Sequence, residues 1–142
     1  MQLRRKLGTF LGMSGADRWL VLEAIAMLGL ARFAVMTVPF RFMTYWLSRT
    51  PEMGACDEIL LLSVRKAVTT AARNVPWNAV CLPQAMAAKA MLARRGCGSS
   101  FHLGADFDAQ GKLVGHAWLV AGSTVVVGAT GIAGVTPLAR FG

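Results

Sequence analysis

The pattern of apolar and polar positions divides the chain into a helical first half and a strand-forming second half. In the first half, apolar residues recur at helical spacing over 19–36, 40–47 and 56–74, and each run ends near a proline. Ser14 and Asp17 form a capping box before the first run. Because this run is apolar on nearly all sides, we expect its helix to be mostly buried.

A fourth helix is expected over 82–95, immediately after Cys81. Pro83 suits the first turn of a helix, and the residues that follow it are good helix formers. Gly96 is a typical stop signal for the end of a helix. The sequence therefore predicts a helix whose N-terminus lies at a cysteine.

After this helix the period of the pattern changes to two, which is typical of strands. Four strands are expected, the last of them closing the sheet: 99–105, 112–120, 123–127 and 135–139. Helices followed by an antiparallel meander predict an α+β class. The length fits a single domain over 1–142, with a helical part over 1–75 and the Cys81 helix plus sheet over 76–142.

The composition requires a test for membrane-spanning segments, because 55% of the residues are hydrophobic and the mean hydropathy is +0.50. No uncharged run within 19–47 exceeds eight residues, whereas a spanning helix needs about 20. The basic start of the chain is too short in its apolar part, and too rich in glycine, for a signal peptide. We therefore expect a cytoplasmic protein, with peripheral contact to a partner or a membrane left open.

The net charge of +8, from 15 Lys and Arg against 7 Asp and Glu, indicates an acidic partner. No nucleic-acid motif is present, and the basic residues lack the aromatic interleaving of a single-strand binder. We therefore expect no nucleic-acid partner and favour an acidic peptide or protein surface. Lys89, Arg94 and Arg95 are expected at a solvated helix end, where they could also contact such a partner.

The three cysteines, Cys56, Cys81 and Cys97, are an odd number in a chain of cytosolic character, which argues against a disulfide framework. Cys56 and Cys97 are therefore interpreted as plain small residues. Two histidines are too few for a zinc site, so no metal and no cofactor is expected.

Cys81 and His116 are the residues best placed for chemistry. The N-terminus of a helix favours a thiolate at Cys81, and its backbone N–H can stabilise an oxyanion. His116 falls on an expected strand, from which an imidazole can deprotonate a helix-borne thiol. Spacing alone is a weak signal, and a small buried cysteine and a structural histidine are the alternatives.

The residues around this pair resemble a known family. The segments are Cys81-Leu82-Pro83-Gln84-Ala85, then Arg94-Arg95-Gly96, then His116-Ala117-Trp118. They are similar to the leader peptidases of lasso-peptide biosynthesis, the transglutaminase-like half of the B-type maturation protein. The resemblance is specific over 76–119 and weaker over nearly all of the chain.

This resemblance implies a reduced papain/transglutaminase-like core and a cysteine protease. The implied activity is removal of the leader from a precursor peptide, so that an ATP-dependent lasso cyclase can form the macrolactam. A small recognition element, the RiPP recognition element, presents the leader. Because the residues before Cys81 are expected to be helical, we expect this element on a separate chain.

The family pattern also has an acidic residue after the histidine, which orients the imidazole. This chain has no Asp or Glu after Asp108, and Gly128 lies near the place where the acid is expected. Three explanations are open: Asp106 or Asp108 folds back to His116; a backbone carbonyl, a hydroxyl or a water orients it; or the enzyme is a Cys-His dyad.

Four further residues are candidates for substrate binding: Trp77, Asn78, Gln84 and Trp118. His102, on the neighbouring expected strand, is interpreted as structural. Two rival functions remain: an acyl transferase on the same Cys-His fold, and a non-catalytic basic helical adaptor that binds an acidic protein or a membrane surface.

Overall fold

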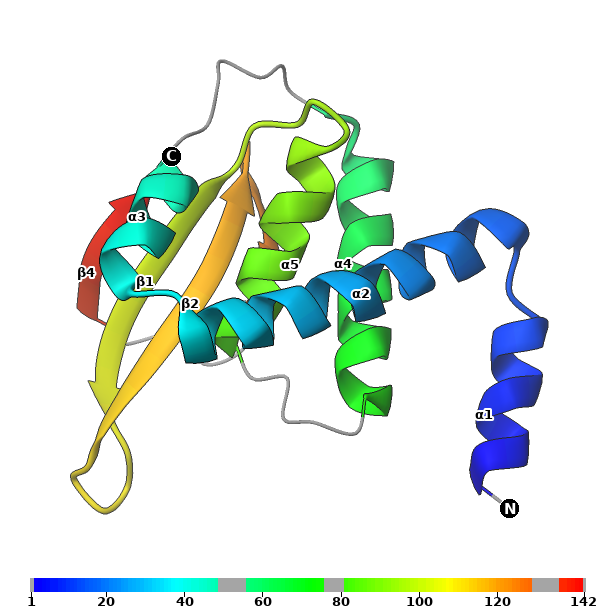
Figure 1. Ribbon diagram of the computed structural model, residues 1–142, viewed down its shortest axis with the longest axis horizontal. Coiled ribbons are helices and arrows are strands. Elements are labelled where there is room, and N and C mark those ends of the chain that lie inside the picture. The colour runs from blue at the N-terminus through cyan, green and yellow to red at the C-terminus, as the bar shows by residue number, and fades with distance from the viewer. Residues whose placement is uncertain (1, 49–55, 76–80, 129–135, 142) are drawn as a thin grey trace.

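The computed structural model describes residues 2–48, 56–75, 81–128 and 136–141 (Figure 1). Within these residues, five helices precede a four-stranded antiparallel sheet, which confirms the α+β class. The elements are α1 (Gln2–Leu11), α2 (Gly15–Thr37), α3 (Phe40–Ser48), α4 (Glu58–Asn74), α5 (Cys81–Ala93), β1 (Ser100–Phe107), β2 (Leu113–Ala121), β3 (Thr124–Val127) and β4 (Thr136–Phe141). Only α1 lacks a counterpart among the elements that the sequence predicts.

The sheet has the strand order β3-β2-β1-β4. The meander from β1 to β3 is confirmed, and the register of β1 and β2 runs from Ser100 opposite Val120 to Phe107 opposite Leu113. The expected fourth strand is confirmed: β4 completes the sheet by pairing with β1, at the edge away from β3. On β3, Arg65 of α4 donates to the carbonyl groups of Val125 and Val126, which satisfies acceptors of this edge strand.

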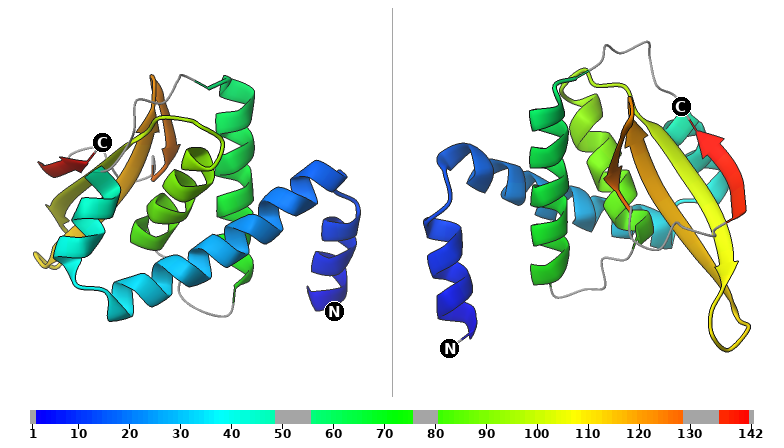
Figure 2. Two further views of the ribbon diagram at one scale, coloured as in Figure 1. Left: turned by 45° about the horizontal axis from the view of Figure 1, so that its top comes forward. Right: turned by 180° about the vertical axis from the view of Figure 1, so that it is seen from behind.

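The helices lie on one side of the sheet. α4 and α5 pack against β2 and β3, and α2 crosses the outside of α4 and α5 (Figures 1 and 2). Seen from behind, the other side of the sheet is covered by no described helix (Figure 2). The described residues thus form a layer of helices on one face of a sheet.

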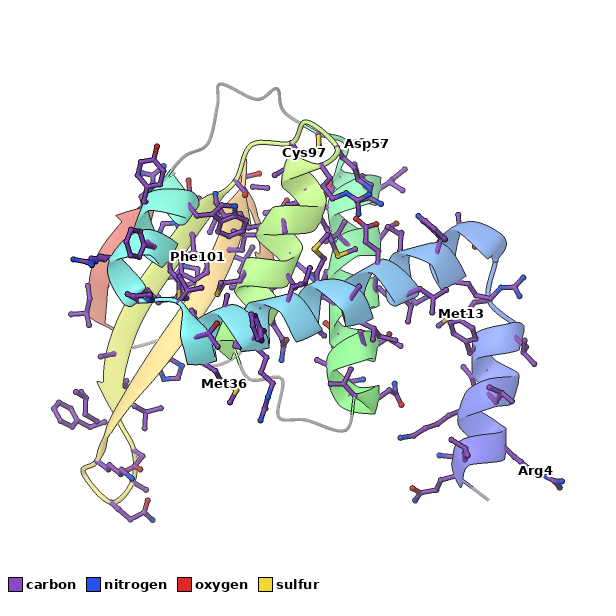
Figure 3. All side chains as sticks on the ribbon, viewed as in Figure 1. Arg4, Met13, Met36, Asp57, Cys97 and Phe101 are labelled. Atoms are coloured by element: carbon purple, nitrogen blue, oxygen red, sulfur yellow. A yellow bond between two sulfur atoms is a disulfide. The ribbon has the colours of Figure 1, made fainter. Side chains whose placement is uncertain are left out.

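The two faces of the sheet follow from the alternation of side chains along β1 and β2. Phe101, Ala117 and Leu119 are buried in the core cluster with residues of α5, and Figure 3 places Phe101 between β1 and the helices. We call this side the helix face. His102 and Trp118, which are opposite one another across the strands, and His116 alternate with those residues. They define the other side, which we call the histidine face.

Helix α2 begins where the capping box predicts, with the Ser14 Oγ accepting a hydrogen bond from the Asp17 N–H at 3.2 Å. The expectation that this helix is mostly buried is wrong. Val21 and Leu28 face the core, whereas Trp19 is 66% exposed. The helix carries apolar stripes on opposite sides, and only one of them packs against α4 and α5.

By length and composition, α2 is the one described helix that could cross a membrane. Of its most apolar stretch of 18 residues, 28% is buried. The core helix of a soluble protein can be equally long and equally apolar. Here the inner stripe of α2 packs on α4 and α5, and the helix also carries the buried carboxylate of Glu23.

Glu23 connects α2 to the end of α5. Its carboxylate accepts hydrogen bonds from Arg94 at 2.7 Å and from Arg95 at 2.6 Å. The hydrogen bond from Arg95 holds the pKa of Glu23 below its usual value, although burial opposes this shift. Lys89 is also buried, and its Nζ donates to the Ser99 carbonyl at 2.9 Å. The expectation of a solvated helix end is therefore wrong for Lys89 and Arg95, while Arg94 stays 58% exposed.

Cys56 and Cys97 form a disulfide, with their Cα atoms 5.5 Å apart. The interpretation of both as plain small residues is wrong. The bond joins the start of α4 to the residues after α5, and Figure 3 shows Cys97 beside Asp57, the N-cap of α4. Because disulfides persist mainly in oxidising compartments, this bond is in tension with the expected cytoplasmic location, which stays a prediction.

Candidate active site

Cys81 is the first residue of α5. Proline is tolerated in the first turn because the N–H groups there have no partner within the helix, and Pro83 occupies that turn. The N–H groups of the first turn and the positive end of the helix dipole favour an anion at this place. A thiol at this position is therefore favoured as a thiolate.

His116 lies on β2, opposite Gly104 of β1. Helix α5 packs on β2 and runs in the same direction (Figure 1). Helix α5 therefore lies along β2, the strand that carries His116.

Alternation along β2 sets the direction of the imidazole. Ala117 and Leu119 pack toward α5 on the helix face, so His116 lies on the histidine face together with Trp118. The side chain of Cys81 is outside the described part of the structure. The structure thus brings the two elements together, and the contact between thiol and imidazole stays a prediction.

Asp106 lies on β1 opposite Val114, on the same sheet face as His116. The two residues are diagonal neighbours across the strand pair, a separation that long side chains span. The Asp106 Oδ1 accepts a hydrogen bond from the Phe107 N–H at 2.8 Å. Among the acids considered from the sequence, Asp106 is therefore the one that shares a face with His116.

Asp108 has a different role, in the turn between β1 and β2. Its Oδ1 accepts hydrogen bonds from the N–H groups of Gln110 and Lys112, both at 2.9 Å. Gly111 in the same turn has φ +75, which favours glycine. The side chain of Asp108 thus builds the turn.

Gly128 lies near the place where the family pattern has an acidic residue after the histidine. Its φ is +86, and a Cβ there would lie 2.5 Å from the Ala117 carbonyl oxygen and 2.8 Å from the Trp118 Cβ. A side chain of any kind would clash with the backbone of β2. The chain therefore has no room for an acidic residue at this position with this backbone.

The rings of Trp118 and His102 stack on the histidine face, with centroids 5.4 Å apart and an interplanar angle of 6°. Arg140 of β4 lies opposite His102 in the register and donates to the Ser100 Oγ at 3.1 Å. Burial, and then the charge of Arg140, lower the pKa of His102. Sequence reasoning did not anticipate this stack, although the alternation of both strands places the two rings on one face.

Of the other candidates for substrate binding, the structure describes Gln84 but not Trp77 or Asn78. Gln84 lies in the first turn of α5 and is half-buried. Trp77 and Asn78 lie outside the described residues. Among the residues that the structure describes, no group of three or more His, Cys, Asp or Glu side chains is arranged to hold a metal ion.

Comparison with known proteins gives one family. The family described as the transglutaminase-like superfamily matches residues 24–140, which is most of the chain. No curated protein and no solved structure matches this chain. The match includes both Cys81 and His116, and the superfamily contains cysteine proteases and acyl transferases. The chain belongs to the transglutaminase-like superfamily.

Proposed function

We propose that this protein is a cysteine peptidase that removes the leader peptide from a lasso-peptide precursor before the macrolactam forms. One observation carries the peptidase assignment: Cys81 begins the helix that packs on the sheet of a transglutaminase-like domain. The narrower substrate class comes from the motif resemblance over 76–119.

In the proposed reaction, the Cys81 thiolate attacks the carbonyl carbon of the peptide bond at the leader–core junction. His116 accepts the thiol proton and later donates it to the leaving amine. The Cys81 N–H stabilises the oxyanion. Water then hydrolyses the thioester, which releases the new carboxyl group and regenerates the thiol.

The position of His116 sets a condition on this mechanism. In the structure its imidazole belongs to the histidine face, whereas α5 packs on the helix face. The reaction therefore requires the His116 end of β2 to turn toward the first turn of α5. Asp106, which shares the histidine face, is proposed as a positioning residue for the imidazole.

The precursor peptide, its recognition element and the cyclase are proposed as partners, and the cytoplasm as the location. The described residues before Cys81 form the helices α1 to α4. These helices differ from a β-rich presenting module, and the recognition element is proposed as a separate partner.

The experiment is incubation of the protein with a precursor peptide and its recognition element, followed by mass spectrometry. We expect one cut that separates leader from core, and we expect Cys81→Ala to leave the precursor intact. Trp19→Ser, an exposed substitution on α2, is the folded control and retains cleavage.

Full cleavage by Cys81→Ala would contradict the mechanism. A product that carries an added amine in place of the new carboxyl group would assign the protein as an acyl transferase instead. Both enzymes use the same thioester, so the product mass separates them.

A further inference from the structure

The side of α2 that faces away from the core carries an apolar stripe. Its largest members are exposed and recur at helical spacing: Trp19, Leu22, Leu30, Phe33 and Met36. Figure 3 shows Met36 pointing outward at the end of α2. Single exposed apolar residues need no explanation, but a contiguous stripe marks a surface for a partner or a membrane.

The stripe continues as a groove. A cavity of about 250 Å³ lies between Trp19, Leu22 and Arg94, and another of about 310 Å³ lies between α2, α3 and α5. Met27 lines both cavities, so they adjoin along α2. Phe42 and Trp46 carry the second cavity onto α3.

Basic residues accompany this apolar surface. Within residues 2–48, six Lys and Arg stand against two acids, Asp17 and Glu23, and Glu23 is paired with Arg94 and Arg95. Arg41 lies over the ring of Phe42, with 4.9 Å between its Cζ and the ring centroid. A cation therefore lies within the apolar surface of α3 itself.

Helix α1 adds a cluster of cations. Leu3, Leu7 and Leu11 are exposed, and Leu3 and Leu7 line a cavity with Val21 of α2 and Thr70 of α4, on the side of α2 away from the outward stripe. Arg4, Arg5 and Lys6 lie between these leucines, and Figure 3 shows Arg4 extending away from the body of the protein. The contribution of α1 to a membrane contact is therefore its cluster of cations, which anionic headgroups attract.

We propose that the outward stripe of α2 and α3 dock on the surface of an anionic lipid bilayer, with the cations of α1 attracted to its headgroups. Trp19 is near one end of the surface, and Tyr45 and Trp46 are at the other. Tryptophan and tyrosine are favoured at the level of lipid headgroups, and arginine and lysine are attracted to anionic ones.

Docking in this orientation directs the helix layer to the lipid and the histidine face of the sheet away from it (Figure 2). The proposal goes beyond the peptidase assignment and does not depend on it. Vesicle binding and peptide cleavage are measured separately, so either can fail alone.

The test is co-sedimentation of the full chain with vesicles. One set is phosphatidylcholine alone, and the other is an equal mixture of phosphatidylcholine and phosphatidylglycerol. We expect binding to the anionic set that weakens with added salt. Phe33→Ser should weaken it about tenfold, and the triple variant Arg4→Gln, Arg5→Gln, Lys6→Gln about a hundredfold.

Ile59→Ser is the matched control, because Ile59 is an equally exposed apolar residue on α4. It should bind as the unaltered protein does. Absence of binding, equal binding to both sets, or an equal loss in Ile59→Ser would overturn the proposal. A dimer in light scattering that Phe33→Ser dissociates, without vesicle binding, would assign the surface to a second copy. A precursor or recognition element that binds only while Phe33 is present, again without vesicle binding, would assign it to a protein partner.

Discussion

The two faces of the sheet differ in burial and in the chemistry of their side chains. The helix face is apolar and covered, with Phe101 and Leu119 fully buried against α5. The histidine face carries His102, Asp106 and His116, and no described helix covers it. The residues that fix the fold are therefore separated from the residues suited to acid–base chemistry by the thickness of a single sheet.

This difference predicts different effects for substitutions on the two sides. Substitutions on the helix side should lower stability, whereas substitutions of His116 and Asp106 on the histidine face should lower activity and leave the fold intact. Cys81 connects the two sides, because it begins the helix that covers one face and is proposed to react with a residue of the other.

The largest effect is expected for His116→Ala, which removes the proposed general base. The rate of leader cleavage should fall by about a thousandfold, measured as kcat/KM by mass spectrometry, while the melting temperature changes little. His102→Ala is the control on the same face, since it removes a ring stacked on Trp118 and no proposed proton carrier. Equal losses of activity in the two variants would remove the distinction between the histidines.

The next effect concerns the disulfide on the helix side. Cys56 and Cys97 are separated by 41 positions in the sequence, and opening a loop of this length costs about 4 kcal/mol of stability. The double variant Cys56→Ser, Cys97→Ser should show this loss in urea unfolding. A reducing agent should destabilise the unaltered protein by a similar amount and leave the double variant unchanged.

Glu23→Gln should lower the free energy of unfolding by about 3 kcal/mol at neutral pH, because it leaves Arg95 without its carboxylate. The pKa of Glu23 is lower in the folded protein than its ordinary value of 4.5, because Arg95 donates a hydrogen bond to the carboxylate. The stability from Glu23 is thus fully present above the unfolded pKa and is lost as the pH falls through the folded pKa.

Acid titrations of the unaltered protein and of Glu23→Gln test this account. Their unfolding free energies should converge as the pH falls through the folded pKa of Glu23. Curves that stay parallel across this range would show that Glu23 does not titrate with a lowered pKa.

The smallest effect is expected for Asp106→Asn, which should reduce kcat/KM about tenfold with little change in stability. Asp108→Asn is the matched control in the adjacent turn, where Asp108 accepts two backbone hydrogen bonds. It should lower stability modestly and leave the specific activity unchanged. The reverse assignment of effects would place the orienting acid at Asp108.

Local signals predicted most of the fold. The hydrogen bond from Asp17 to Ser14 and the start of α5 at Cys81 depend on neighbouring residues, which the sequence displays directly. The alternation over 99–120 likewise predicted β1 and β2. What these signals cannot specify is which side of an element is covered.

The features that sequence reasoning missed are long-range. The apolar pattern of α2 indicates a helix but not that its outer stripe stays exposed. The Cys56–Cys97 bond depends on α4 and α5 packing side by side, whereas the argument from an odd cysteine count is only statistical. The family motif names His116, but only the packing of Ala117 and Leu119 on α5 assigns its sheet face.

The central claim is that Cys81 is an activated thiol served by His116, and the pH dependence of alkylation tests it most directly. With Cys56 and Cys97 in a disulfide, Cys81 is the remaining thiol of the chain, so iodoacetamide labels one site. We predict a midpoint well below the value of about 8.5 for a free cysteine, and a shift back toward that value in His116→Ala. A midpoint near that of a free cysteine, unchanged in His116→Ala, would contradict the account.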